Sequence, residues 1–243
     1  MSEKIQKVLA NAGLGSRREI EGWIHEGRIT INDRVATIGD RMTYHDKVSV
    51  DGREIKLARS KNTHSRVLIY HKPEGEMCTR HDPEGRRTIF ESLPMIRNSR
   101  WICVGRLDYN TSGLLLITND GELANKLMHP SSEIEREYAV RIRGDVDEAS
   151  LTRMKKGIKL EDGMAHFESI EYVGGTGHNH WYHCIVKEGR NRLVRRVWES
   201  QGFSVSRLIR VRFGPIHLTP GIRRGRCAEL TEEEVTELSR LYS

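Results

Sequence analysis

The chain has 243 residues and a formal net charge of +6 at pH 7. This length allows one large domain or two modest ones, with enough core that no disulfide or metal is needed to stabilise the fold. A mild basic excess is compatible with a polyanionic partner but does not establish one. No apolar run is long enough to cross a membrane, and the four cysteines contain no C-x-x-C pair, which indicates free thiols. A cytoplasmic protein is therefore expected.

Residues 1–58 are predicted to form a small N-terminal module that begins with two helices. Ser2 is placed to cap a first helix that ends at Gly13. Residues 16–19 have the pattern of a capping box and open a second helix, which Gly27 ends.

Two hairpins complete this module, and a linker follows it. The hairpins are predicted at residues 28–35 and 48–57 from their turn-forming Asn, Asp and Gly residues. Residues 59–65 are polar and lack periodicity, which is typical of a linker. A larger domain, residues 66–243, would then follow.

Arg17 and Arg18 lie in the first turn of the second predicted helix. The helix dipole disfavours cations there by a few tenths of a kcal/mol. A bound phosphate would reverse the sign of this effect, because helix N-termini bind anions. The alternative, that both side chains simply extend into solvent, has about equal weight.

A polar turn between two apolar runs is the centre of the larger domain. The runs at 101–104 and 114–117 are predicted to be buried strands. They hold a turn that presents Asp108, with Arg106 two positions before it, to a ligand. Taken by spacing alone, Asp, Asn, Ser and Gly in this turn are ordinary turn formers.

The rest of the larger domain is predicted to alternate strands with short helices. The elements are a strand at 67–70, a helix at 122–128 between Asp120 and Pro130, strands at 137–143, 181–186 and 205–213, a helix capped by Asn191 and ended by Gly202, and a C-terminal helix opened by the capping box 231–234. Alternation along 137–143 places Tyr138 on the inward face, where a tyrosine is most often a core residue.

Positive charge is concentrated between Lys187 and Arg226. This stretch contains eleven basic residues against two glutamates, a net charge of +9, while the rest of the chain is near −3. Such a concentration favours a phosphate-facing surface over a merely solvated basic face. Within it, Arg192, Arg195 and Arg196 are spaced to form one cationic stripe on the predicted helix.

Three histidines near a predicted strand have a spacing that suggests a metal site. In an extended segment His178 and His180 point to one face and His183 to the other, so three ligands would not converge. No metal is therefore expected.

Four stretches together resemble known sequence motifs of one enzyme family. LANAGLGSRREIEGWIHEGRITINDRVA resembles an S4 RNA-binding domain, and GRLDYNTSGLL resembles the catalytic-loop motif of the RsuA/RluB family of RNA pseudouridine synthases. EREYAV and EGRNRLVRRV resemble the second and third motifs of the same family, in the same order.

The resemblance implies an α+β fold: a pseudouridine synthase domain, with a mixed, largely antiparallel sheet, flanking helices and a central cleft, plus an N-terminal S4 domain. It implies isomerisation of uridine to pseudouridine with no cofactor and no metal. The target base must leave the RNA helix. Asp108 would then act at ribose C1′ or take the 2′ proton; the sequence does not choose between these schemes.

The family motifs also assign roles to individual residues. The implied catalytic residues are Asp108, Tyr138, which would hold the base, and Arg195, which would form an ion pair with Asp108. The resemblance and the charge pattern give the remaining expected RNA contacts: Arg106, which would fill the vacated slot, Asn110, Thr111, Ser112, Arg190, Arg192, Arg196, Arg17, Arg18, Arg28 and Lys7.

The implied partner is 23S rRNA of the precursor large subunit, and the member of the family most similar to this chain acts on uridine 2605. Sister enzymes acting on other 23S or 16S sites stay open, as does a non-catalytic rRNA-binding assembly factor with the same scaffold. A monomer is the default expectation, although no sequence feature determines the oligomeric state.

Overall fold

The computed structural model describes residues 2–43, 45–57, 65–97 and 99–241, which belong to two compact units. Unit 1 contains residues 1–65 with two later segments, 94–102 and 119–121, and unit 2 contains 66–93, 103–118 and 122–243. The linker predicted at 59–65 lies outside the described residues except for Ser65.

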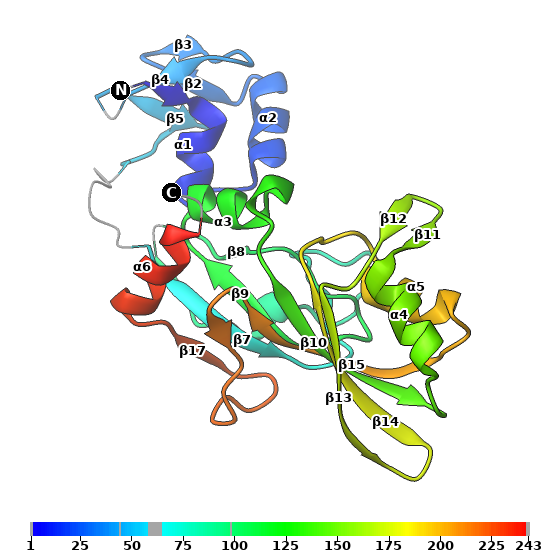
Figure 1. Cartoon of the computed structure of the whole chain (residues 1–243). Coiled ribbons are helices and arrows are strands. Elements are labelled where there is room, and N and C mark those ends of the chain that lie inside the picture. The colour runs from blue at the N-terminus through cyan, green and yellow to red at the C-terminus, as the bar shows by residue number, and fades with distance from the viewer. Residues whose placement is uncertain (1, 44, 58–64, 98, 242–243) are drawn as a thin grey trace. The chain divides into compact units, whose positions relative to one another are not determined.

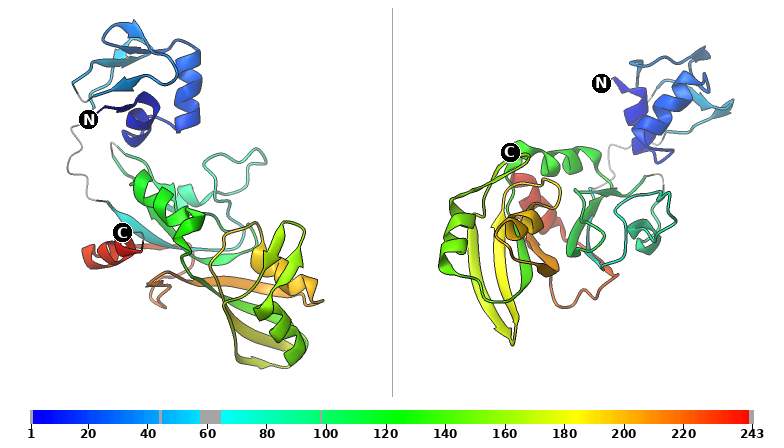
Figure 2. Two further views of the ribbon diagram at one scale, coloured as in Figure 1. Left: turned by 45° about the horizontal axis from the view of Figure 1, so that its top comes forward. Right: turned by 90° about the vertical axis from the view of Figure 1, so that its right-hand side faces the viewer.

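Unit 1 packs two helices on a small antiparallel sheet (Figure 2). Its main elements are α1 (Ile5–Asn11), α2 (Arg17–His25), β2 (Ile29–Ile31), β3 (Arg34–Val35), β5 (Val48–Val50) and β6 (Arg53–Glu54), with the strands in the order β3-β2-β5-β6. Apolar side chains alternate along β2 and β5, so Ile29, Ile31, Val48 and Val50 bury one face against the helices.

Most of the predicted N-terminal elements are confirmed, with one correction at the start. The capping box at Ser16 is formed, with reciprocal hydrogen bonds to Glu19, and both hairpins are present. The predicted cap at Ser2 is wrong. Glu3–Lys4 forms β1, which pairs with β4 (Arg41–Met42), so the chain is extended before α1 and the helix begins at Ile5.

Unit 2 is built on a mixed, largely antiparallel sheet, as predicted (Figure 1). In the described residues its strand order is β13-β14-β10-β15-β9-β7-β17; the strands are β7 (Val67–Lys72), β9 (Ser112–Thr118), β10 (Arg136–Arg143), β13 (Ser169–Thr176), β14 (Asn179–Val186), β15 (Val205–Phe213) and β17 (Cys227–Glu229), with β8 (Ile102–Cys103) beside β9 and β16 (Ile216–His217) beside β15. β15 and β9 run parallel, and the pairs β13–β14, β14–β10, β10–β15, β9–β7, β7–β17 and β15–β16 are antiparallel.

Helices α4 (Glu148–Lys156) and α5 (Leu193–Ser200) cover one face of β10, β14 and β15 (Figure 1). Trp198 of α5 is fully buried there and contacts the rings of Phe167, Tyr182 and Phe203. The remaining small elements are α3 (Gly121–Met128), α6 (Glu232–Arg240), the hairpin β11 (Ile158–Leu160) with β12 (Gly163–Ala165), and 3-10 turns at Ile89–Ser92 and Pro130–Ser132. The predicted capping box at Thr231 is confirmed.

The start of α5 differs from the prediction. Asn191 does not cap it; the residue before the helix is Arg192, in the left-handed region with φ of 48°, and among the described residues no side-chain cap bond is formed there. Because Arg192 lies outside the helix, the spacing that placed it in a stripe with Arg195 and Arg196 does not apply.

Gly113 permits the parallel contact between β9 and β15. It has φ of +111°, and a Cβ atom at this position would lie 2.3 Å from the carbonyl oxygen of Arg210. The two residues are register partners. A side chain here would therefore separate the strand that follows the Asp108 turn from β15.

In the described part of the chain, no helix has the length and apolarity that crossing a membrane requires. Cys78, Cys103, Cys184 and Cys227 are all free.

Gly113→Ala is expected to destabilise unit 2 by about 3 kcal/mol, because it combines a strained φ with a backbone clash. Gly221→Ala, where a Cβ would meet no atom within 4 Å, is the matched control and should change stability by less than about 0.5 kcal/mol. Denaturant unfolding of both variants measures the difference; equal effects would contradict the close-approach account.

Candidate active site

The turn that presents Asp108 is held by its backbone carbonyl oxygens. Lys72, the last residue of β7, donates from Nζ to the carbonyl oxygens of Asp108 at 3.1 Å, Thr111 at 2.9 Å and Pro73 at 2.9 Å. Its side chain is fully buried. Lys72 therefore holds both ends of the segment 108–111.

Other groups hold the rest of the same backbone. Arg195 of α5 donates from Nη2 to the carbonyl oxygen of Asn110 at 2.8 Å, and the Gly75 N–H donates to that of Tyr109 at 2.9 Å. The Cys78 thiol lies 3.4 Å from the carbonyl oxygen of Leu107. Each carbonyl from Leu107 to Thr111 thus accepts a bond from another part of unit 2, which makes the loop rigid.

Lys72 and Arg195 are buried cations without a carboxylate bonded to them among the described residues. Burial lowers the pKa of both side chains, and the negative charge of Asp108 acts in the opposite direction on each. Both cations therefore lie close enough to Asp108 to feel its charge, although their hydrogen bonds go to the backbone.

The expected ion pair between Arg195 and Asp108 is not formed in the described structure. Arg195 is only 5% exposed and donates to the backbone of Asn110 and of Val205, the latter at 2.9 Å. The Arg195 side chain bonds the loop backbone instead of the carboxylate, and Trp198 and Val194 fix α5 in the core. Arg195 is a support of the loop backbone rather than a direct partner of Asp108.

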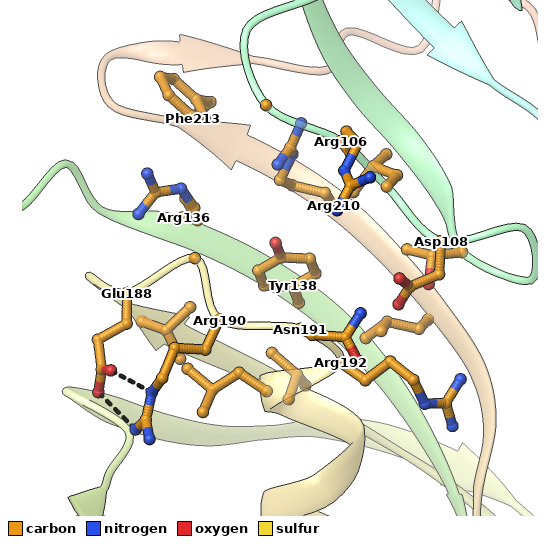
Figure 3. Close-up of a pocket in the computed structure, with 18 of the residues that line it drawn as sticks. Arg106, Asp108, Arg136, Tyr138, Glu188, Arg190, Asn191, Arg192, Arg210 and Phe213 are labelled. Carbon is orange, nitrogen blue, oxygen red and sulfur yellow. Dashed lines mark hydrogen bonds and ion pairs between the residues drawn. The ribbon is translucent and has the colours of Figure 1, made fainter. Parts of the chain in front are cut away.

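Asp108 lies at the edge of a cavity of about 500 Å³ whose lining comes entirely from unit 2. Figure 3 shows Asp108 and Arg192 toward one end, and Tyr138 in the middle with its hydroxyl toward Arg136 and Arg210. Tyr138 is partly buried and also packs against the core beneath the sheet. The structure thus brings Asp108 and Tyr138 to one cavity.

The cavity wall carries two arginines that the sequence did not single out. Arg136 begins β10 and Arg210 lies in β15, and both guanidinium groups lie over the ring of Phe213, at 5.3 and 5.5 Å from its centroid. For Arg136 a signal exists in the strand alternation, which places residues 136 and 138 on the same face. Arg210 belongs to the basic stretch 187–226 but was given no role of its own. Lys72 had no such signal, because a lysine at a strand end usually reaches solvent.

The predicted basic surface at 187–226 is partly neutralised, which corrects part of the charge argument, while Arg223, Arg224 and Arg226 stay exposed. Carboxylates from elsewhere in the chain pair with it: Arg190 and Arg196 with Asp162, Arg212 with Glu135 and Glu137, and Lys187 with Glu168. Arg195 and Arg210 are buried. The predicted single stripe of Arg192, Arg195 and Arg196 is therefore wrong, and counting charge along the sequence overstated the exposed positive charge.

The other residues expected to contact RNA near Asp108 differ in their exposure. Arg106 and Asn110 are exposed, while Thr111 is buried at the cavity and Ser112 is buried within β9, away from the lining. Ser112 is thus not presented to a ligand in this structure.

In unit 1, the basic residues expected to contact RNA divide into two pairs. Arg17 and Arg18 are at the start of α2, and both are exposed. Arg28 is held by Asp51 and Glu26, and Lys7 pairs with Glu3. The side chains of Arg28 and Lys7 would have to leave these carboxylates to reach RNA.

Two of the three histidines near β14, His180 and His183, contact carboxylates. His183 pairs with Glu137 across the sheet at 2.6 Å. Among the described residues, no group of three or more His, Cys, Asp or Glu side chains is arranged to hold a metal ion.

Two family models match this chain. One, described as RNA pseudouridylate synthase, matches residues 66–200, and the other, described as S4 domain, matches residues 3–42. The chain belongs to the RNA pseudouridylate synthase family. The first match includes the Asp108 loop, Tyr138 and Arg195.

Similar proteins are named as pseudouridine synthases. Ribosomal large subunit pseudouridine synthase B of Pseudomonas aeruginosa is 58% identical over 98% of this chain and 62% of that protein, and the protein of the same name from Haemophilus influenzae is 58% identical over 98% and 68%. The chain thus spans about two thirds of the length of these relatives. A crystal structure of a pseudouridylate synthase matches with a TM-score of 0.68 at 22% identity, over 97% of this chain and 99% of that one, which shows a shared fold.

Lys72→Met is expected to lower stability by about 3 kcal/mol, because it leaves the carbonyl oxygens of Asp108 and Thr111 without their buried donor. Hydrogen exchange at residues 106–111 should accelerate together with this loss. Lys155→Met, at an exposed lysine of α4, is the control. Unchanged exchange in the loop of the Lys72 variant would contradict the role given to this lysine.

Proposed function

We propose that this chain isomerises a uridine of 23S rRNA to pseudouridine during assembly of the large ribosomal subunit. The main support for this proposal is that Asp108, on a rigid loop, and Tyr138 line one cavity of unit 2. The family and the names of its relatives support the reaction and the class of substrate. Uridine 2605 is the expected target, because the sequence resembles that of the family member that acts on this uridine.

The proposed division of labour follows the two family matches. Residues 1–58 would bind rRNA as an S4 domain, residues 59–65 would link, and residues 66–243 would carry out catalysis. A monomer in the cytoplasm, where bacterial ribosomes assemble, is the simplest arrangement for this substrate. No cofactor or metal is invoked, because an isomerisation needs no external electrons or group donor.

The chemistry begins with extrusion of the target nucleotide, which costs a few kcal/mol. Arg106 is exposed beside the cavity and would fill the slot that the base leaves. Asp108 would then act on the ribose, either by bonding to C1′ or by taking the 2′ proton. In both schemes the base departs and turns, and C5 bonds to C1′.

The loop geometry explains how one carboxylate can do this. The carbonyl oxygens of Asp108, Asn110 and Thr111 are already bonded, so the backbone need not reorganise when substrate enters. Preorganised positioning of this kind contributes to catalysis by avoiding the entropy and reorganisation cost of alignment. Tyr138 would hold the base. A glycoside hydrolase, which also breaks a bond at C1′, would instead require a second catalytic carboxylate at the loop.

The principal alternative is a non-catalytic rRNA-binding assembly factor with the same scaffold, and Asp108 distinguishes the two. Asp108→Asn keeps the shape of the side chain and removes its charge. Pseudouridine formation on an rRNA fragment should be abolished while rRNA affinity changes by no more than a few fold. Retained activity in this variant would refute the assignment, and inactivity of the unaltered chain would favour the assembly factor.

The S4 domain is expected to contact phosphates through Arg17 and Arg18, at the N-terminus of α2. Replacing both by alanine should weaken rRNA binding and flatten its salt dependence, by about 0.7–0.9 in slope for each phosphate that is no longer neutralised. Arg53→Ala with Lys56→Ala removes the same charge from the same unit and serves as control. Equal slopes for the two double variants would remove α2 from the binding surface.

A further inference from the structure

Arg210 has an unusual position in the sheet of unit 2. Its register partners are Tyr138 on one side and Gly113, in the strand that follows the Asp108 loop, on the other. It is 3% exposed, yet it contributes to the cavity lining. Arg210 is thus a buried cation between the two parts of the proposed catalytic site.

The guanidinium of Arg210 is incompletely bonded. Its Nε donates to the carbonyl oxygen of Leu114 at 2.7 Å, which fixes the direction of the group. Its Nη2 is buried and has no hydrogen-bond partner among the described residues. A buried donor without a partner is costly, so its presence on a cavity wall needs an explanation, and a ligand that accepts the hydrogen bond supplies one.

Arg136 adds a second cation to the same wall. Its Nη1 donates to the carbonyl oxygens of Ile134 and Lys187, and its guanidinium shares the Phe213 ring with Arg210. Burial lowers the pKa of Arg136, and the like charge of Arg210 lowers it further. Within the described residues, neither arginine forms an ion pair with a carboxylate, so this wall is suited to an anion.

The position of the wall favours a base over a backbone phosphate as that anion. A phosphodiester stays near the RNA strand and water, whereas an extruded base is the part of the nucleotide that enters deepest. Tyr138, the residue proposed to hold the base, is the direct neighbour of Arg210 in the sheet. Its hydroxyl points toward these arginines in Figure 3.

The reaction itself creates an anion at this place. When the C1′–N1 bond breaks, its electron pair stays with uracil, and the charge spreads over N1, O2 and O4. After the ring turns, C5 supplies an electron pair to C1′. C5 then loses its proton and N1 gains one, and any proton taken from C2′ is returned, so no atom or electron is added overall.

We propose that Arg210, assisted by Arg136, forms an anion-binding subsite that donates hydrogen bonds to a carbonyl oxygen of the detached uracil and stabilises its negative charge until the C5 bond forms. This inference rests on the proposed function and makes Arg210 a catalytic residue of that reaction. Donors aimed at charge that develops in the transition state typically contribute about 10²–10³ in rate.

The test compares Arg210→Gln on two rRNA fragments, one with uridine at the target and one with 5-fluorouridine. Fluorine withdraws electrons and makes uracil a more stable leaving anion, so it should compensate for a missing donor. Single-turnover loss of the original nucleoside, followed by chromatography of the digested RNA, should slow about 100-fold with uridine and about tenfold with 5-fluorouridine. Arg210→Lys, which keeps the charge, should lie between the variant and the unaltered chain.

Arg141→Gln is the matched control, because Arg141 lies on the same strand as Arg136, bonds Ser206 and is not part of the cavity lining. It should leave both rates unchanged. If Arg210→Gln does not fold, as thermal melting will show, Arg136→Gln takes its place with the same expected pattern.

Two results would overturn the inference. One is an equal loss of rate with both substrates, which indicates a structural role. The other is a loss confined to RNA affinity and its salt dependence, which indicates phosphate binding. A complete lack of activity in the unaltered chain would instead overturn the proposed function, so the two failures can be distinguished.

Discussion

This structure depends on the hydrogen bonds that two buried cations donate to the backbone carbonyl oxygens of the Asp108 loop. Lys72 and Arg195 arrive from different elements, β7 and α5, and bond the backbone of the loop that carries Asp108. A buried cation needs polar partners, and a buried carbonyl needs a donor. The cations and the loop carbonyl groups satisfy each other's need for a partner. The Asp108 carboxylate is thereby fixed in position, while its oxygens form no hydrogen bond within the described protein.

This arrangement links the sheet to the proposed chemistry. Gly113 allows β15 to approach β9, and the pairing of these strands sets Arg210 between the Asp108 loop and Tyr138. The same sheet therefore positions the acting carboxylate, the aromatic residue that would hold the base and the cationic wall. One cavity then contains the carboxylate of Asp108, where the sugar would react, and the guanidinium groups of Arg136 and Arg210, where the departing base would carry its charge.

Sequence patterns predicted the fold well where the bonds they imply are local. The capping boxes at Ser16 and Thr231 and the turns at 32–33 and 51–52 formed as expected, because their bonds join residues close in sequence. Ser2 and Asn191 failed as caps because strand pairing and a left-handed residue at Arg192 decided those helix starts. The parallel pairing of β9 with β15 has no local signal at all.

The site could be predicted in part. Two family motifs singled out Asp108 and Tyr138, and the structure brings both to one cavity. The predicted Arg195–Asp108 ion pair is replaced by bonds to backbone, and part of the basic stretch is paired with acids distant in sequence, such as Asp162 and Glu137. Lys72 was missed because its acceptors include segments that only the folded sheet brings together. The periodicity of a single sequence indicates local structure and gives no information about such long-range contacts.

The most direct test of the central claim is a crystal structure of the chain with an rRNA fragment that carries 5-fluorouridine at the target. The account predicts the base inside the cavity, a carboxylate oxygen of Asp108 within about 3.5 Å of C1′ or the 2′ position, and the bonds from Lys72 and Arg195 to the loop intact. A base bound outside the cavity, or a loop that abandons these bonds when RNA binds, would contradict it.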